Sequence, residues 1–432
     1  MAETTWQARY EHLAARLPAL ARQAAPVFCG FSACVDARAS MHAMDPLLAT
    51  TEVVPARFRD VLLDRAARGI GGEIFFDWPE GAAWLGARLP LAYALGGTGP
   101  QAAATLTALG APAVMALEDR SAHMLARVPG AILLADADGF VPAARVAPRG
   151  QRRPDIFIFE YTAGVPIGPV VPPRSSRIIV RFLDPGIEHD ADFERLSLAP
   201  PPSFPAPGAG LVSGYNSVRR ELLPDEYAYT RRLADGWRRA GARTIHLELA
   251  GYDSAALAEE AVTALAGHYT SICMSQSEFR LYFGEGALGA GMVALAERLG
   301  VARVCVHADD WAASAVLGEA SGDMDALMTG CLLAAARAAT DRLALPAAPP
   351  AGARYATPPF PEPQRHGAYT LVSCATPHLV SPATTLGLGD SFTAGCLLVL
   401  GQAASTTAAD GLDRPPVTAS FTTKIEQPGG TP

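Results

Sequence analysis

Short apolar runs alternate with segments of helical periodicity along most of this 432-residue chain. A strand followed by a helix and then by another strand is typical of parallel α/β proteins. The apolar runs that we interpret as buried strands are 27–31, 114–117, 132–134, 156–161, 178–182, 211–212, 244–249, 271–274 and 301–307. The pattern predicts an α/β fold with a large, mostly parallel central sheet that has helices on both faces.

Two segments interrupt this alternation, at 38–92 and 148–185, where the apolar runs are shorter and alternate more strictly with polar residues. The chain also exceeds the usual size of a single hydrophobic core. We therefore expect a large α/β domain made of residues 1–37, 93–147 and 186–432. The two interrupting segments are expected to form a smaller lid that contains a sheet of its own.

Charge and cysteine usage limit the partners that the chain can have. The formal net charge is -8, so there is no basic surplus to displace the counterions of a nucleic acid. No apolar run reaches the ~18 residues of a membrane span. The seven cysteines are odd in number and dispersed, as in proteins of a reduced compartment. These features predict a cytoplasmic protein, a monomer or small homo-oligomer, that binds neither nucleic acid nor membranes.

A loop near the C-terminus combines two glycines with a carboxylate, in the order Gly387, Leu388, Gly389 and Asp390. The apolar run at 394–400 predicts a buried helix directly after it, and the N–H groups at a helix N-terminus bind anions. A Cβ atom at either glycine would hinder the approach of a phosphate. Asp390 then suits phosphoryl transfer as the base that takes the proton of an incoming hydroxyl. The alternative is that Asp390 only caps the helix, and the motif alone does not decide between them.

A second glycine turn, Gly96-Gly97-Thr98-Gly99, precedes a stretch with helical pattern at 101–109. Alone, this turn favours a structural role. Together with the glycine loop near the C-terminus, it resembles the ribokinase-like superfamily of sugar kinases. The resemblance implies that the first turn touches the acceptor sugar and that the second loop holds the phosphates.

Within that superfamily the chain resembles the ADP-dependent glucokinase and phosphofructokinase family. The segment 28–37 is similar to the family motif GFNxNVDA, and 156–161 followed by 173–179 resembles its IFEY and PRANRFI segments. Further similarities follow in family order, to the SGY strand end at 212–215, the HxE motif at 246–248, the NxxE motif at 275–278, the VHT strand end at 306–307 and the TVGLGD segment at 385–390. The resemblance thus covers nearly the whole chain.

The resemblance implies a ribokinase-like, Mg²⁺-dependent kinase that transfers the terminal phosphoryl group of ADP to a hydroxyl of a sugar or sugar phosphate, of the glucose or fructose 6-phosphate type. It also implies roles for particular residues. The acceptor would contact Ser32, Asp36, Glu73, Gly97, Thr98 and Arg177, the metal would be held by Glu248 and Glu278, the phosphates would lie against Gly387, Leu388 and Gly389, and Asp390 would be the general base.

Several of these side chains also have a structural interpretation. Asp36, which we place at the end of the first buried strand, can accept hydroxyl hydrogen bonds or act as a cap. Glu73 can be a solvated surface residue. Glu248 and Glu278 offer the hard oxygen ligands that Mg²⁺ prefers, but each can equally form a structural salt bridge. Arg177 can bind a phosphate or simply occupy a strand edge.

The chain departs from the family pattern mainly at expected asparagines. Ser32 and Thr98 replace two asparagines near the sugar, Ser275 replaces that of NxxE, and Ser176 replaces the one before Arg177. A site that hydrogen-bonds hydroxyls discriminates most sharply through such groups. The departures therefore weaken the inference about which acceptor is used more than the inference that the protein is a kinase. An ATP-dependent sugar or nucleoside kinase and a catalytically inactive sugar- or nucleotide-binding homologue remain alternatives.

Overall fold

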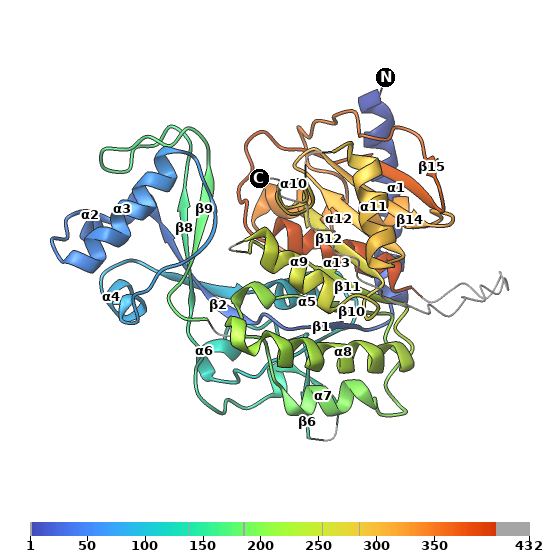
Figure 1. Cartoon of the computed structure of the whole chain (residues 1–432), viewed down its shortest axis with the longest axis horizontal. Coiled ribbons are helices and arrows are strands. Elements are labelled where there is room, and N and C mark those ends of the chain that lie inside the picture. The colour runs from blue at the N-terminus through green and yellow to red at the C-terminus, as the bar shows by residue number, and fades with distance from the viewer. Residues whose placement is uncertain (1, 138, 185, 253, 285, 403–432) are drawn as a thin grey trace, which may run out of the picture. The chain divides into compact units, whose positions relative to one another are not determined.

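A large mixed sheet forms the centre of the fold (Figure 1). The computed structural model describes residues 2–402 except 138, 185, 253 and 285. Within these residues the sheet has 11 strands, in the order β15 (Gln364–His366), β16 (Tyr369–Ala375), β14 (Trp311–Leu317), β13 (Arg303–His307), β12 (Ser271–Ser275), β11 (Thr244–Glu248), β10 (Ala209–Val212), β1 (Val27–Cys29), β5 (Ala113–Met115), β6 (Leu133–Asp136) and β7 (Gly139–Pro142). The strands from β13 to β6 run parallel, and antiparallel strands complete both edges. The predicted large, mostly parallel sheet is confirmed.

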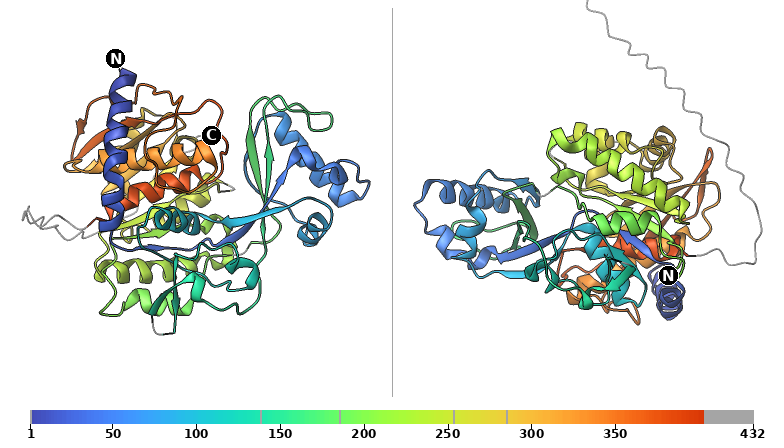
Figure 2. Two further views of the ribbon diagram at one scale, coloured as in Figure 1. Left: turned by 180° about the vertical axis from the view of Figure 1, so that it is seen from behind. Right: turned by 90° about the horizontal axis from the view of Figure 1, so that it is seen from below.

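Helices cover both faces of this sheet (Figures 1 and 2). One layer contains α7 (Ala191–Leu198), α8 (Leu223–Arg239), α9 (Ala255–Ala264), α10 (Gln276–Phe283) and α11 (Leu288–Leu299). The other contains α1 (Ala2–Gln23), α5 (Thr98–Ala108), α12 (Asp323–Thr340) and α13 (Leu388–Leu400). Strand β1 shows why both layers form: Phe28 packs in the first apolar cluster, and its neighbours Val27 and Cys29 pack in the second. Successive side chains of a strand point to opposite faces, so an unbroken apolar strand needs two covers.

A second sheet has five strands, in the order β3 (Gly72–Phe75), β9 (Ser176–Arg181), β8 (Ile156–Tyr161), β2 (Cys34–Ser40) and β4 (Ala92–Gly96). Helices α2 (Asp45–Leu48), α3 (Val53–Ala67) and α4 (Gly81–Gly86) accompany it, and we call this sheet with these helices the lid (Figure 1). Apolar side chains of α3 pack against β8 and β9. The lid sheet extends beyond the expected segments 38–92 and 148–185, since β2 begins at Cys34 and β4 ends at Gly96. Residues 403–432, which we assigned to the large domain, lie outside the described part.

The carboxyl ends of the parallel strands are where a ligand site is expected in such a sheet. Strands β1, β10 and β11 end there, and short α6 (Ala122–Leu125) follows β5. Helices α5 and α13, which contact each other, both begin directly after a glycine turn. The two glycine turns that the sequence brought to attention are therefore carried by neighbouring helices.

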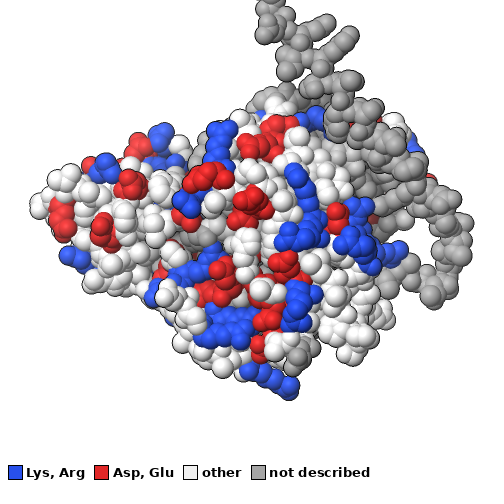
Figure 3. Space-filling view, turned by 60° about the horizontal axis from the view of Figure 1, so that its bottom comes forward, with Lys and Arg blue, Asp and Glu red and all other residues white. Residues whose placement is uncertain are grey.

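The surface carries both signs of charge. On the face shown in Figure 3, Arg side chains are interspersed with Asp and Glu side chains. Ion pairs between partly exposed side chains include Arg232 with Glu194 at 2.7 Å and Arg149 with Asp192 at 3.5 Å. Among the described residues, no helix combines the length and the apolar character that crossing a membrane requires.

Candidate functional site

The glycine loop near the C-terminus forms the N-terminus of α13. Gly387 precedes the helix with a φ of 68°, and its carbonyl accepts the N–H of Ser391 at 3.0 Å as the first bond of the helical ladder. The amides of Leu388, Gly389 and Asp390 come before that bond, and no side chain caps this helix end. Because the first N–H groups of a helix have no helical acceptor, this turn presents donors suited to an anion.

Asp390 is the third residue of α13, so it does not occupy the N-cap position that a purely capping aspartate would take. Its carboxylate interacts with the cations Arg337 and Arg177 and with the side chain of Thr98. Burial raises the pKa of Asp390, and Arg337, Thr98 and Arg177 act in the opposite direction. A carboxylate whose pKa is moved upward is a better proton acceptor near neutral pH.

Asp36 does not lie at the end of the first buried strand, which corrects our expectation. Strand β1 ends at Cys29, and the chain starts a new strand, β2, at Cys34, so Asp36 belongs to the lid sheet. There it pairs with Ala94 of β4 on one side and with Ile156 of β8 on the other. Strands β1 and β2 lie so close in the sequence that periodicity alone predicted one strand in place of two.

The Asp36 side chain is buried, and burial raises its pKa to about 7. A hydrogen bond from the Cys34 thiol opposes this shift, Asp390 adds to it by repulsion, and Arg38 and Arg337 again oppose it. The Cys34 Sγ lies 3.6 Å from Asp36 Oδ1. The carboxyl of Asp36 is thus close enough to that of Asp390 to affect its ionisation.

The diglycine turn packs against Ser32. Gly97 has a φ of 90°, and a Cβ atom there would lie 1.7 Å from the carbonyl oxygen of Ser32, so only glycine fits. The Thr98 N–H donates to Ser32 Oγ at 3.2 Å, and Ser32 Oγ lies 3.1 Å from Ser213 Oγ. Since the Thr98 side chain also interacts with Asp390, the structure brings Ser32, Gly97 and Thr98 together with the predicted base.

Glu73 of the lid is tied to the large domain. It forms an ion pair with Arg181 at 2.5 Å, and Asn216 Nδ2 donates to its Oε2 at 3.0 Å. Its side chain is only 18% exposed, which contradicts the alternative of a solvated surface residue. Arg181 is also paired with Asp184, so its guanidinium forms ion pairs with two carboxylates.

Arg177 of β9 faces the carboxylates of Asp390, Glu160 and Asp36. Its Nε is buried and has no hydrogen-bond partner among the described residues. Burial lowers the pKa of this guanidinium, and the three carboxylates oppose the shift. An arginine with an open donor next to Asp390 is suited to contact an anionic ligand.

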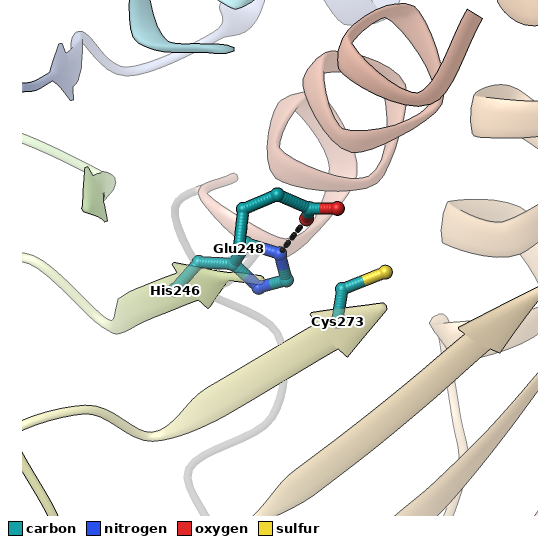
Figure 4. Close-up of side chains that lie close together, drawn as sticks. All are labelled: His246, Glu248 and Cys273. Atoms are coloured by element: carbon teal, nitrogen blue, oxygen red, sulfur yellow. Dashed lines mark hydrogen bonds and ion pairs between the residues drawn. The ribbon is translucent and has the colours of Figure 1, made fainter. Parts of the chain in front are cut away.

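Glu248 lies at the end of β11, inside a buried hydrogen-bond network (Figure 4). Its Oε2 accepts from Thr393 Oγ1 at 2.8 Å and lies 3.1 Å from His246 Nε2, whose other ring nitrogen is 2.9 Å from Ser271 Oγ. Burial raises the pKa of Glu248 to about 7 and lowers that of His246 to about 3. His246, Glu248 and Cys273 lie close enough to share a cation. However, hydrogen bonds occupy both ring nitrogens of His246, and Mg²⁺ prefers oxygen ligands over thiols.

Glu278 caps a helix, a structural role that we did not predict and that differs from the salt bridge offered as the alternative. It forms a capping box at the start of α10: the Glu278 N–H donates to Ser275 Oγ at 3.2 Å, and the Ser275 N–H donates to Glu278 Oε2 at 2.7 Å. Burial raises the pKa of Glu278 to about 7, the two Ser275 bonds oppose this, and Glu248 adds to it. A buried carboxylate, Glu248, that raises the pKa of the half-buried Glu278 fits a site for a divalent cation, which would remove the repulsion.

The sequence reasoning missed several residues of this region, above all Arg337, Gln101 and Asn216. Arg337 of α12 is buried and donates to Gly387 O at 3.1 Å and to Gln101 Oε1 at 2.8 Å. The signal that could have found it is a lone charged residue within the otherwise apolar stretch Ala334-Ala335-Ala336-Arg337-Ala338-Ala339.

No protein-family model matches this chain, and no curated protein matches it by sequence. Solved structures match it over nearly their full length. An ADP-dependent kinase in complex with fructose 6-phosphate and ADPβS is similar with a TM-score of 0.77 at 14% identity, covering 93% of this chain and 99% of that one. The last common ancestor of ADP-dependent phosphofructokinases from Methanosarcinales is similar with a TM-score of 0.72 at 15% identity, covering 92% and 99%. A phosphofructokinase from Pyrococcus horikoshii OT3 with AMP is similar with a TM-score of 0.67 at 16% identity, covering 88% and 98%. The protein therefore has the fold of the ADP-dependent phosphofructokinases, as its sequence motifs implied.

Proposed function

We propose that this protein is a Mg²⁺-dependent sugar kinase that transfers the terminal phosphoryl group of ADP to a hydroxyl of a sugar or sugar phosphate. One observation carries the proposal. The carboxylate of Asp390, at the open N-terminus of α13, interacts with the side chain of Thr98 in the diglycine turn, and the two helices that carry these residues contact each other. In the proposed site, the base thus lies next to an anion-binding helix end and next to a turn suited to hold an acceptor.

In the proposed reaction, the acceptor hydroxyl lies between Asp36 and Asp390. Its oxygen attacks the terminal phosphorus, the bond to the bridging oxygen breaks, and the proton passes to Asp390. With ADP as donor, the products are the phosphorylated acceptor and AMP. The amides of Leu388 to Asp390 and the guanidinium of Arg177 stabilise the charge on the transferred phosphoryl oxygens.

Glu248 and Glu278 are the residues that would hold Mg²⁺, directly or through water, because the buried Glu248 raises the pKa of the half-buried Glu278 by repulsion. When bound, the cation would neutralise charge on the phosphates of the nucleotide. The chain itself keeps Glu248 in place through Thr393 and His246. Glu278 is kept in place by its capping bonds to Ser275.

The choice of ADP as donor is supported by the solved structures that share this fold, since the two most similar ones reported above are ADP-dependent. The acceptor class is supported by the same comparison, in which one structure holds fructose 6-phosphate. We also infer a reduced, cytoplasmic location, because all seven cysteines are free thiols. A monomer or small homo-oligomer remains our prediction.

The test is to incubate the protein and Mg²⁺ with ADP or ATP over a panel of sugars and sugar phosphates, and to identify the products by mass spectrometry and phosphorus NMR. We expect AMP and one phosphorylated acceptor to form from ADP. Product from ATP alone would favour an ATP-dependent sugar or nucleoside kinase. Sugar binding by calorimetry without turnover of either nucleotide would favour a non-catalytic binding protein.

A further inference from the structure

A buried arginine lies directly behind the turn that begins α13. Arg337 is in the last turn of α12 and is 8% exposed. Its Nη1 donates to Gln101 Oε1 at 2.8 Å, to the carbonyl of Gly387 at 3.1 Å and to Ser391 Oγ at 3.3 Å. A single nitrogen of Arg337, which belongs to α12, therefore bonds to acceptors of two other helices, α5 and α13.

The contact with Gln101 reaches the diglycine turn. The N–H of Gln101 donates to the carbonyl of Gly97 at 3.0 Å, and its side-chain amide donates to the carbonyl of Leu95 in β4. Gln101 therefore bonds both to the diglycine turn, through Gly97, and to Arg337. Arg337 connects the turn beside Ser32 and Thr98 to the turn that ends at Asp390.

The sequence of the α13 turn is adapted to this arginine. A Cβ atom at residue 387 would lie 2.4 Å from the guanidinium of Arg337, far inside contact distance. Gly387 therefore has two reasons to be glycine, its φ of 68° and the close approach of Arg337 from inside the fold. A ligand in front of the turn would meet the amides while the arginine supports the turn from behind.

The charged groups around Arg337 also favour its position behind the α13 turn. The charged groups that interact with Arg337 are Asp390, Asp341, Arg38 and Asp36, three of which are carboxylates. The cations that interact with Asp390 are Arg337 and Arg177, and Asp36 and Glu248 are carboxyls whose ionisation it affects. Arg337 is hydrogen-bonded to the turn, whereas Arg177 keeps an open Nε. The two arginines therefore differ: Arg337 bonds to the protein, and Arg177 has a buried Nε that bonds to none of the described residues.

We propose that Arg337 is a positioning residue for phosphoryl transfer, which holds the Gly387–Asp390 turn against the diglycine turn so that the amides and the base face the same reacting group. This inference rests on the proposed kinase function. It predicts that Arg337 acts on the transition state, where geometry matters most, and hardly on substrate binding. The rigid, planar guanidinium holds Nη1 in one place, whereas a lysine ammonium on its flexible stem loses more conformational freedom when it takes the same position.

The test compares Arg337→Met, Arg337→Lys and Gln101→Leu with the wild type, using the donor and acceptor identified in the substrate panel. For Arg337→Met we expect kcat to fall about 10²-fold while both KM values stay within about threefold. Arg337→Lys should keep more activity than Arg337→Met but remain about tenfold below the wild type. Gln101→Leu removes one acceptor of Arg337 and also the bond that Gln101 donates to Leu95 O, and should lower kcat by a smaller factor with the same unchanged KM values.

Arg120→Met is the matched control. Arg120 is another buried arginine, but its guanidinium bonds to Asp190, Ala135 O and Leu117 O and to neither glycine turn. Its loss should lower the unfolding temperature without changing kcat of the folded enzyme. If Arg337→Met is too unstable to purify, Arg337→Lys and Gln101→Leu still decide the question.

Two failures can be told apart. A wild type that turns over no nucleotide contradicts the proposed function itself. An active wild type whose folded Arg337 and Gln101 variants keep kcat within about threefold contradicts the role of Arg337 alone. Equal losses of kcat in Arg337→Met and Arg120→Met would also overturn it, because the effect would then follow from the loss of any buried arginine.

Discussion

The two ends of the candidate site differ in how their polar groups are occupied. At the α13 end, the amides of 388–390 precede the first helical bond, and Arg177 has a buried Nε without a partner among the described residues. At the acceptor end, Ser32 is bonded to Thr98 and Ser213, and Glu73 to Arg181 and Asn216.

The difference indicates that the two ends of the site have different functions. Open donors can take up the charge of a ligand, whereas groups that already bond to each other mainly determine the shape of a pocket. The chain's departures from the family pattern, such as Ser32 and Thr98, lie at the acceptor end. We therefore expect substitutions at the α13 end to change the rate, and substitutions at the acceptor end to change which substrate is used.

The largest expected effect follows from removing the base. Asp390→Asn keeps the volume of the side chain but cannot take a proton, so kcat should fall ~10²–10⁴-fold with little change in KM. Steady-state kinetics with ADP and the identified acceptor checks this. Activity within a few-fold of the wild type would remove Asp390 from the reaction, and with it the contrast between the two ends.

The next effect concerns the shape of the turn. Gly387→Ala places a Cβ atom against Arg337 and forces alanine into a φ of 68°, so we expect kcat to fall by one to two orders of magnitude, about 10–100-fold. The substitution should also destabilise the protein by about 1–3 kcal/mol.

Gly352→Ala is the control for this prediction, because Gly352 has a φ of 77° but no atom within 4 Å of its would-be Cβ. It should cost about 1–2 kcal/mol of stability through backbone strain alone and leave kcat unchanged. Unfolding by denaturant and kinetics on the same samples measure both quantities. Similar kcat values for the two variants would show that the contact with Arg337 is unimportant.

A smaller effect separates the two roles of Glu278. Glu278→Gln keeps an oxygen that can accept the Ser275 N–H but loses the charge, so the Mg²⁺ concentration for half-maximal activity should rise about tenfold. Ser275→Ala should instead destabilise the helix cap by about 1 kcal/mol and leave the Mg²⁺ requirement nearly unchanged. A Mg²⁺ titration of both variants tests this, and an unchanged requirement in Glu278→Gln would restrict Glu278 to capping.

The smallest effect is a pH dependence at the acceptor end. The pKa of Asp36 is raised to about 7, and it must be ionised to accept two hydroxyl hydrogen bonds. As the pH falls from 8 to 6.5, its ionised fraction falls about fourfold, and kcat/KM for the acceptor should fall equally. Asp36→Asn should raise the KM of the acceptor and flatten this part of the profile. If the profile of Asp36→Asn matched that of the wild type, Asp36 would not bind the acceptor in its ionised form.

Much of the fold followed from local patterns. The strands at 156–161 and 244–249 and the helix after Gly387 were predicted within a few residues, because continuous apolar runs and a glycine before a helix are signals of short range. The antiparallel edge made by β14 and β16 was not predicted. Strand order depends on pairing between segments far apart in the chain, and no local signal carries it.

The sequence by itself determined the parallel α/β architecture and the open helix end at Gly387 to Asp390, since periodicity and glycine geometry act over a few residues. Only the tertiary structure decided that Asp36 lies in the lid sheet, that Glu73 is bonded across to Asn216, and that Arg337 supports the α13 turn from behind. These contacts join residues up to hundreds of positions apart. Their strength and the raised pKa values of the carboxyls depend on burial, which exists only once the elements have packed together.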